Sequence, residues 1–182
     1  TQIGCQFKCK FCAYSKVKLV RNLTTGEIID QLLKVQSKVS DISRVSLCAM
    51  GEPLDNYESV ISALNIFSKS WGLGFSFGDV CVSTCGLVPG IIALADSKIP
   101  VKLSVGLHSI NDKTRSLLMP INEEFSIDKL LEAVKYYGIK TGIIVDLEYM
   151  LLADVNNSYN DAKYLIKKLL CLPVKIVLTT YE

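Results

Sequence analysis

Three cysteines stand close together near the start of the chain, at Cys5, Cys9 and Cys12. Their C-x3-C-x2-C spacing places three thiols on one short loop. Thiolates are the protein ligands of iron–sulfur clusters, and a fully protein-ligated [4Fe–4S] cluster takes four of them. Three thiolates would leave one iron open, and an open metal position is where a substrate can bind. The spacing therefore predicts a [4Fe–4S] site with one open iron.

Zinc is the alternative metal for this loop. A zinc site would use the three cysteines together with His108, the only histidine in the chain, or with another group as the fourth ligand. Structural zinc sites favour paired C-x2-C elements, so the spacing favours the cluster. Zinc and unligated thiols both stay open as alternatives at this point.

Four further cysteines lie outside the loop, at Cys48, Cys81, Cys85 and Cys171. Cys81 and Cys85 are four residues apart on an expected strand, which separates their Cα atoms by roughly 13 Å. A disulfide needs Cα atoms within about 7 Å. Seven cysteines without a visible signal peptide indicate a reducing compartment, which we take to be the cytoplasm. We therefore expect these four cysteines to be small apolar fillers.

The bulk composition describes one well-cored domain. The chain has 182 residues, of which 49% are hydrophobic, and a net charge of only +2. It contains no apolar run of about 18 residues, so no transmembrane helix and no membrane partner are expected. Positive charge gathers around the cysteine loop at Lys8, Lys10, Lys16, Lys18 and Arg21. This charge could steer a polyanion to the loop, or it could simply belong to a solvated loop.

Segments typical of strands alternate with segments typical of helices. Strands are expected at residues 44–50, 79–85, 101–108, 143–150 and 174–181. Helices are expected after a capping box at 24–27, at 60–67 and 89–96, after Ser126 and after Ser158. A loop that carries Arg115, Met119 and Asn122 is expected to follow His108. This alternation predicts βαβ units and a parallel sheet.

Polar and unusual residues fall at the ends of the expected strands. Gly51 and Glu52 end one strand, Ser83 lies near the end of the next, His108 closes the following one and Glu148 lies late on another. In parallel α/β folds, ligands bind at the carboxyl ends of the strands. We therefore expect these residues and the cysteine loop to meet at one mouth.

Several longer blocks occur in a characteristic order. They are the cysteine motif, residues 21–28, Met50-Gly51-Glu52-Pro53-Leu54, Ser83-Thr84-x-Gly86-Leu87-Val88-Pro89-Gly90, Leu107-His108-x-x-Asn111-Asp112, Met119-Pro120-Ile121-Asn122 and Glu148-Tyr149-x-Leu151-Leu152. The cysteine motif resembles the signature of radical S-adenosylmethionine (SAM) enzymes, in which SAM chelates the open iron. The whole set resembles the RlmN/Cfr family of radical SAM RNA methyltransferases.

This resemblance implies a fold, a reaction and its partners. The fold would be α/β, a partial (β/α)6 TIM-like barrel with a parallel sheet, spanning residues 1–182 with its first strand and last helix lost or shortened. The reaction would be methylation of carbon 2 of an adenine in 23S rRNA, and possibly in tRNA. It would use a [4Fe–4S] cluster and SAM, which the cluster cleaves to a 5′-deoxyadenosyl radical, with flavodoxin as the usual electron donor. Methylation at carbon 8, as in resistance-type members, and a non-catalytic SAM- or RNA-binding remnant are the alternatives.

The resemblance also implies roles for individual residues. Cys5, Cys9 and Cys12 would ligate the cluster, and Phe11 would pack beside it. The positions that match SAM-contacting positions of the family are Gly51, Glu52, Ser83, Gly106, Leu107, His108 and Glu182. The role of Glu148 stays open.

The chain departs from the family pattern at several positions. Gly106 replaces a serine, Ala49 replaces a glycine, and Glu182 stands where the family has an asparagine that contacts SAM. The family places its general base, its adduct-resolving cysteine and an RNA-binding domain upstream of Thr1, and its methyl-carrying cysteine downstream of Glu182. We therefore expect no catalytic residue within the chain, and a radical SAM core that is truncated at both ends.

Overall fold

The computed structural model describes residues 1–39, 41–69 and 72–181. Its main sheet consists of the parallel strands β3 (Val45–Leu47), β4 (Val80–Thr84), β5 (Lys102–Gly106), β6 (Val145–Leu151) and β7 (Val174–Thr180). The strands lie in the order β3-β4-β5-β6-β7, so each strand is paired with its neighbours in the sequence. Right-handed crossovers between such strands place the connecting helices on one face of the sheet.

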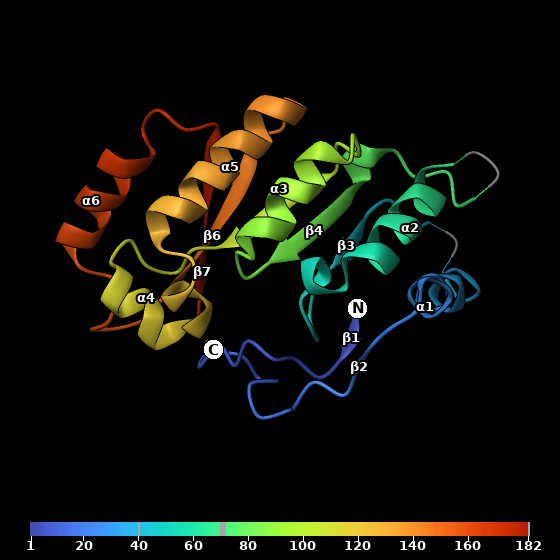
Figure 1. Cartoon of the computed structure of the whole chain (residues 1–182), viewed down its shortest axis with the longest axis horizontal. Coiled ribbons are helices and arrows are strands. Elements are labelled where there is room, and N and C mark those ends of the chain that lie inside the picture. The colour runs from blue at the N-terminus through green and yellow to red at the C-terminus, as the bar shows by residue number, and fades with distance from the viewer. Residues whose placement is uncertain (40, 70–71, 182) are drawn as a thin grey trace.

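The helices in the described ranges are α1 (Thr25–Gln36), α2 (Tyr57–Ser68), α3 (Val88–Asp96), α4 (Asp112–Leu118), α5 (Ile127–Thr141) and α6 (Tyr159–Leu169). Of these, α2 and α3 each connect two neighbouring strands, as do α5 and α6. Figure 1 shows α2, α3 and α5 following one another over the sheet, with the N-terminal segment on the other side of the strand ends. The predicted α/β fold with a parallel sheet is confirmed.

The segment in front of the cysteine loop takes no part in the main sheet. Its two-residue strand β1 (Gln2–Ile3) pairs antiparallel with β2 (Arg21–Asn22). Within the described residues the parallel sheet therefore has five strands, where a (β/α)6 barrel would have six. The expected first strand is represented only by this short β1.

Local sequence signals set the helix starts. The Thr24 hydroxyl accepts a hydrogen bond from Glu27 N at 3.3 Å, and the Glu27 carboxylate accepts one from Thr24 N at 2.9 Å, so the capping box predicted for α1 is confirmed. The Ser126 hydroxyl caps α5 by accepting a hydrogen bond from Lys129 N, and Ser158 forms a second capping box with Asp161 at the start of α6. Satisfying these otherwise unpaired N–H groups stabilises each helix by about 1 kcal/mol.

The loop predicted after His108 is wrong, because α4 and a 3-10 helix (Pro120–Glu123) occupy it. Asn111 caps α4 by accepting a hydrogen bond from Thr114 N at 3.2 Å. The buried residue of α4 is Arg115, whereas its Leu117 is 62% exposed. A helix that buries a charge and exposes a leucine lacks the apolar periodicity by which helices are found.

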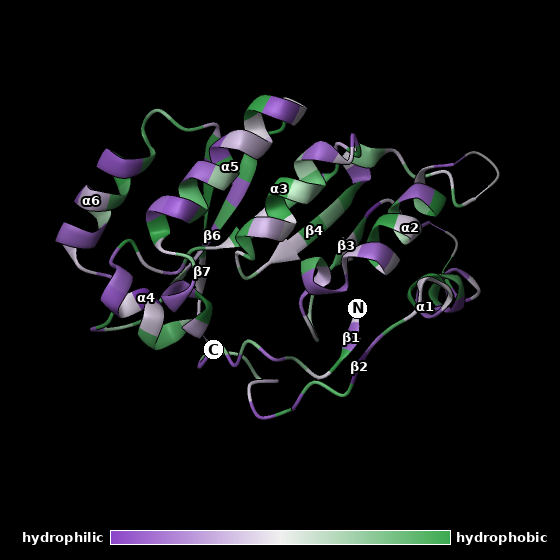
Figure 2. Ribbon diagram, viewed as in Figure 1, coloured by the Kyte–Doolittle hydropathy of each residue, from purple (hydrophilic) through white to green (hydrophobic). Residues whose placement is uncertain are grey.

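The two faces of the sheet differ in character. Val82 and Leu147 lie on the face that packs against the helices and have exposed fractions of 0%. Their neighbours Ser83 and Glu148 point to the other face and are half-buried. Figure 2 shows hydrophilic residues on the outward sides of α5 and α6. Small and polar side chains thus leave space on the inner face of the sheet, near the strand ends.

None of the helices in the described ranges combines the length and the apolar character that crossing a membrane requires.

Candidate functional site

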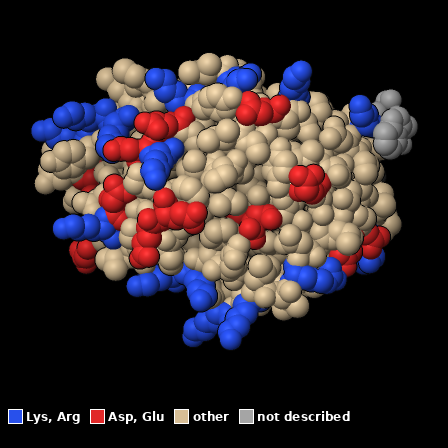
Figure 3. All heavy atoms as spheres, viewed as in Figure 1, with Lys and Arg blue, Asp and Glu red and all other residues tan. Residues whose placement is uncertain are grey.

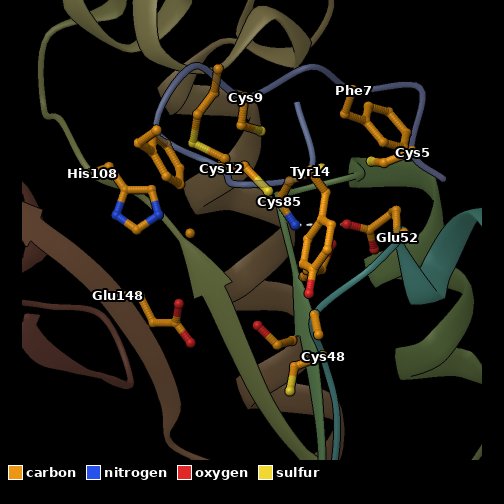
Figure 4. Close-up of a pocket in the computed structure, with 17 residues that line it drawn as sticks. Cys5, Phe7, Cys9, Cys12, Tyr14, Cys48, Glu52, Cys85, His108 and Glu148 are labelled. Carbon is orange, nitrogen blue, oxygen red and sulfur yellow. Dashed lines mark hydrogen bonds between the residues drawn. The ribbon is translucent and has the colours of Figure 1, made fainter. Parts of the chain in front are cut away.

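A cavity of about 340 Å³ opens at the carboxyl ends of β3, β4, β5 and β6, beneath the cysteine loop. It is lined by Cys5, Phe7, Cys9, Phe11, Cys12, Tyr14, Cys48, Ala49, Gly51, Glu52, Ser83, Thr84, Cys85, Gly106, His108, Met119 and Glu148. Figure 4 shows the His108 ring and the Glu148 carboxylate on one side of the cavity and Glu52 on the opposite side. The predicted convergence of strand-end residues on one mouth agrees with this arrangement.

Leu107, predicted to contact SAM, is not among the residues that line this cavity, because its side chain is fully buried in the core. Glu182 lies outside the described residues.

Backbone hydrogen bonds anchor the cysteine loop on both sides. Cys5 N donates to Val17 O at 3.1 Å, which closes the loop on itself. Lys10 N donates to Leu118 O at 2.8 Å, which fastens the loop to the end of α4. The three thiols are therefore held along one wall of the cavity (Figure 4).

Two thiols of this loop, those of Cys5 and Cys9, are protonated in the metal-free protein. Burial raises the pKa of Cys9 to about 12, and the neighbouring Cys5 and Cys12 add to this rise. Burial also raises the pKa of Cys5. Metal binding must therefore displace protons from the loop. Within the described ranges, no group of three His, Cys, Asp or Glu side chains is arranged around one point as ligands of a single metal ion.

Glu52 is a buried carboxylate with an exposed fraction of 2%. Its Oε1 accepts a hydrogen bond from Leu54 N at 3.0 Å, and its Oε2 accepts one from Cys85 N at 2.7 Å. Burial raises the pKa of Glu52, although these hydrogen bonds and those from the Cys85 and Thr84 side chains oppose the rise. The carboxylate is thus fixed in place before any ligand arrives.

A residue that sequence reasoning missed ties Glu52 to the N-terminal segment. The buried Gln2 side chain accepts a hydrogen bond from Glu52 N at 2.8 Å and donates to Asp55 at 2.7 Å and to Asn22 at 2.8 Å. Its partners are up to 53 positions away, so no local pattern could reveal it.

His108 is a neutral histidine that is 5% exposed. Its Nδ1 accepts a hydrogen bond from Met150 N at 3.1 Å, so the proton of the neutral ring is on Nε2. Burial and then the charge of Arg115 lower the pKa of His108 to about 4. The ring meets Phe11 edge-on, with centroids 4.7 Å apart. Together the two rings close one wall of the cavity.

Gly106 and Glu148 face each other across β5 and β6. A Cβ atom on Gly106 would lie 3.0 Å from His108 Nε2, so the missing side chain lets the histidine ring pack tightly. Glu148 Oε1 accepts a hydrogen bond from the Ser104 hydroxyl at 2.6 Å. This bond fixes the Glu148 carboxylate at the edge of the cavity.

The expectation that the outlying cysteines are apolar fillers needs correction. Cys48 and Cys171 are exposed, and both Cys48 and Cys85 line the cavity. Burial raises the pKa of Cys85 well above its usual value, so it is a neutral thiol. Its place at the end of an expected strand was the available signal that it belongs to the site.

Comparisons with known proteins agree with this geometry. The family described as the radical SAM superfamily matches residues 1–162. A Clostridium botulinum (strain Eklund 17B / Type B) protein named "Probable dual-specificity RNA methyltransferase RlmN" is 45% identical over 175 residues, which are 94% of this chain and 50% of that protein. The chain spans about half the length of the curated relatives that it matches.

Solved structures give the same result. A radical SAM methyltransferase from Sphaerobacter thermophilus is 36% identical, with a TM-score of 0.94 over 97% of this chain and 53% of that one. Streptococcus suis SuiB, solved with bound S-adenosylmethionine, has a TM-score of 0.74 over 100% of this chain and 39% of that one. At 16% identity, SuiB shares the fold alone.

Proposed function

The chain belongs to the radical SAM superfamily, and we propose that residues 1–182 are the cofactor-binding core of an RNA methyltransferase of the RlmN type. One observation carries this proposal. A loop with three thiols faces a buried carboxylate and a neutral histidine across a single cavity at the strand ends. Half of the length of its relatives lies outside the match, and we place the residues that resolve the methylated base there.

The donor set of the loop fits a [4Fe–4S] cluster. Cys5, Cys9 and Cys12 line the same cavity, and each would ligate one iron of the cluster through its thiolate. When bound, such a cluster supplies the electron that cleaves SAM. Phe11 and His108 exclude water from the adjacent wall through their edge-on contact.

The residues around Glu52 fit the amino acid end of SAM. Each Glu52 oxygen accepts one hydrogen bond from a backbone N–H, and the carboxylate so positioned would pair with an ammonium group. Gly51 lines the cavity and has a φ of +93°, and its lack of a side chain makes room for the Gln2 side chain that holds Glu52 N. Ser83 and the backbone of Gly106 and Leu107 would make further contacts, as would Glu182.

His108 would donate a hydrogen bond from Nε2 to SAM. Because its pKa is about 4, the ring stays neutral near pH 7 and adds no positive charge beside the sulfonium. This neutrality favours binding of a cationic ligand.

The proposed substrate is an adenine of 23S rRNA, and possibly of tRNA, methylated at carbon 2 by the full-length enzyme. The resemblance of the ordered blocks supports it, and so does the name of the C. botulinum relative as an RNA methyltransferase. A cytoplasmic location and an electron donor such as flavodoxin complete the proposal. The test is to incubate the full-length enzyme with RNA, SAM and reductant and to map the modified nucleoside by mass. The map distinguishes methylation at carbon 2 from methylation at carbon 8. A nucleoside that gains no methyl group contradicts both.

The cluster is tested on the chain itself. We expect anaerobic reconstitution with iron and sulfide to give about four irons per chain and a broad absorbance near ~400 nm. Cys9→Ala should lose most of both signals. Cys171→Ala is the matched control, because Cys171 is exposed and lies outside the cavity. Equal iron in the two variants would contradict the assignment.

A further inference from the structure

Arg115 on α4 is fully buried, with an exposed fraction of 0%. Its guanidinium donates hydrogen bonds to Leu107 O at 3.1 Å, Asn122 Oδ1 at 2.9 Å, Cys85 O at 3.0 Å and Gly106 O at 2.9 Å. All four acceptors are neutral oxygen atoms. The hydrogen bonds therefore fix the group in space without compensating its charge.

No carboxylate in the described ranges pairs directly with this charge. None of the ion pairs among the described residues includes Arg115. The nearest acidic side chain in sequence, Asp112, accepts its hydrogen bonds from Asn122 Nδ2 at 3.0 Å and from Ile127 N at 2.9 Å instead. A buried charge without a hydrogen-bonded partner of opposite charge is costly. An anion that forms nearby would therefore stabilise the Arg115 guanidinium.

The cysteine loop is the part of the site that can supply this anion. Arg115 Nη2 donates to the carbonyl oxygens of Cys85 and Gly106, and both residues line the cavity together with Cys5, Cys9 and Cys12. Cysteines ligate metals as thiolates. A metal held by the loop would therefore bring negative charge into the cavity, next to the residues that hold Arg115.

We propose that Arg115 is the buried counter-charge of the metal site, and that it raises the reduction potential of the cluster held by the cysteine loop. This inference rests on the cluster proposed above. A cluster that accepts one electron from a reductant carries one more negative charge than before. A fixed cation in a surrounding of low dielectric constant therefore favours the reduced form.

The fold makes this cation rigid and keeps it beside the loop. The helix that carries Arg115 ends at Leu118, whose carbonyl oxygen accepts the hydrogen bond from Lys10 of the loop. On the other side, a Cβ atom on Gly86 would lie 3.0 Å from Arg115 Nη2. The guanidinium is thus enclosed between α4 and the turn after β4, so its charge is neither screened by water nor free to move away.

The test is a potentiometric titration of the reconstituted chain, followed by EPR, with Arg115→Gln, Arg115→Lys and wild type compared. Arg115→Gln removes the charge and keeps a hydrogen-bond donor. We expect its ratio of reduced to oxidised cluster at a fixed potential to fall about tenfold, equivalent to ~59 mV for one electron. Arg115→Lys keeps the charge, and its ratio should stay within a factor of about three of the wild-type ratio, equivalent to ~30 mV.

Lys113→Gln is the matched control, because it removes an exposed cation from α4, the helix that carries Arg115. Water screens that charge, so the potential should hardly change. If the reduction potential of Arg115→Gln equals that of wild type, the inference about Arg115 is overturned and the proposed function is unaffected. Where Arg115→Gln does not fold, Arg115→Lys decides, and a tenfold fall in that variant overturns the inference. A wild-type chain that takes up no iron overturns the proposed function and this inference with it.

Discussion

Two residues at the cavity have a positive φ, a backbone conformation that glycine adopts more easily than other residues. Ala49 has a φ of +70° and His108 a φ of +52°. Such a conformation costs an L-residue about 1 kcal/mol or more. His108 offsets the cost through its bond to Met150 N and its contact with Phe11. Ala49 is exposed and stands where the RlmN/Cfr family has a glycine.

Ala49→Gly should therefore stabilise the protein by about 1 kcal/mol, measured as an increased midpoint of urea unfolding. Gly51→Ala is the opposite test two residues away. Its Cβ atom would lie 2.6 Å from Gln2 Cβ on backbone with a φ of +93°, so stability should fall. A destabilised Ala49→Gly would contradict the assigned strain.

His108 makes stability depend on pH. Its pKa is about 4 in the folded state against 6.5 ordinarily, so the unfolded chain binds more protons between these values. The stabilisation is complete above about pH 6.5 and is lost as pH falls toward 4, to a total of roughly 3 kcal/mol. The raised pKa of Glu52 acts in the opposite sense, so the curve to measure is wild type minus His108→Asn. A difference that does not change between pH 6.5 and 4 would contradict the assignment.

At the scale of elements, the site depends on how closely α3 approaches the 3-10 helix Pro53–Asn56 (Figure 1). Glu52 is the N-cap of that 3-10 helix, and its carboxylate accepts the hydrogen bond from Leu54 N. Gly90 in the first turn of α3 faces Leu54, and a Cβ atom there would lie 2.5 Å from Leu54 Cβ. The missing side chain allows the approach that positions Glu52.

Gly90→Ala should destabilise the fold by about 1–3 kcal/mol, because an overpacked contact forces the two elements apart. It should also weaken SAM binding to the reconstituted chain, measured by calorimetry. Gly26→Ala in α1 is the matched control, since its Cβ atom meets only Thr24 Oγ1 at 4.0 Å. That variant should be neutral or stabilised by up to about 1 kcal/mol. Equal free energies of unfolding in the two variants would show that the close approach of α3 to the 3-10 helix does not affect stability.

Most of the elements, but not all of their contacts, could be predicted from the sequence. The strands and the longer helices follow apolar periodicity and caps, and the convergence at the cavity follows from parallel topology. Apolar periodicity does not reveal α4, because the inward residue of that helix is Arg115. The strand-end position of Cys85 indicates that it could belong to the site, but no local pattern reveals its hydrogen bond to Glu52, which is 33 positions away. Contacts across such separations arise only when the sheet forms.

At the scale of the whole molecule, charge is distributed unevenly. Figure 3 shows Lys and Arg side chains along the lower edge of the molecule, where Figure 1 places the N-terminal loop. The lysines of this loop, Lys8, Lys10, Lys16 and Lys18, are exposed. Arg21 is instead paired with Glu27 at 2.7 Å, so it adds less to the patch than its sequence position suggested. Four exposed cations beside the cavity mouth fit an approaching phosphate backbone.

Replacing these four lysines by glutamine should weaken RNA binding and reduce the salt dependence of the affinity, by a slope of roughly 0.7 for each phosphate that is no longer neutralised. Replacement of Lys38, Lys135, Lys163 and Lys167, which are exposed on helices or just after one, is the control with an equal change in net charge. Fluorescence anisotropy across a salt series measures both. Equal weakening in the two variants would contradict a specific RNA surface at the loop.

The most direct test of the account is the EPR spectrum of the reduced, reconstituted chain with and without SAM. Because the proposed cluster would have one iron that no cysteine of the loop ligates, we expect SAM to change the cluster signal in wild type. We expect Glu52→Gln to require a much higher SAM concentration for the same change. A cluster signal that SAM leaves unaltered, or a colourless protein that contains zinc, would contradict the central claim.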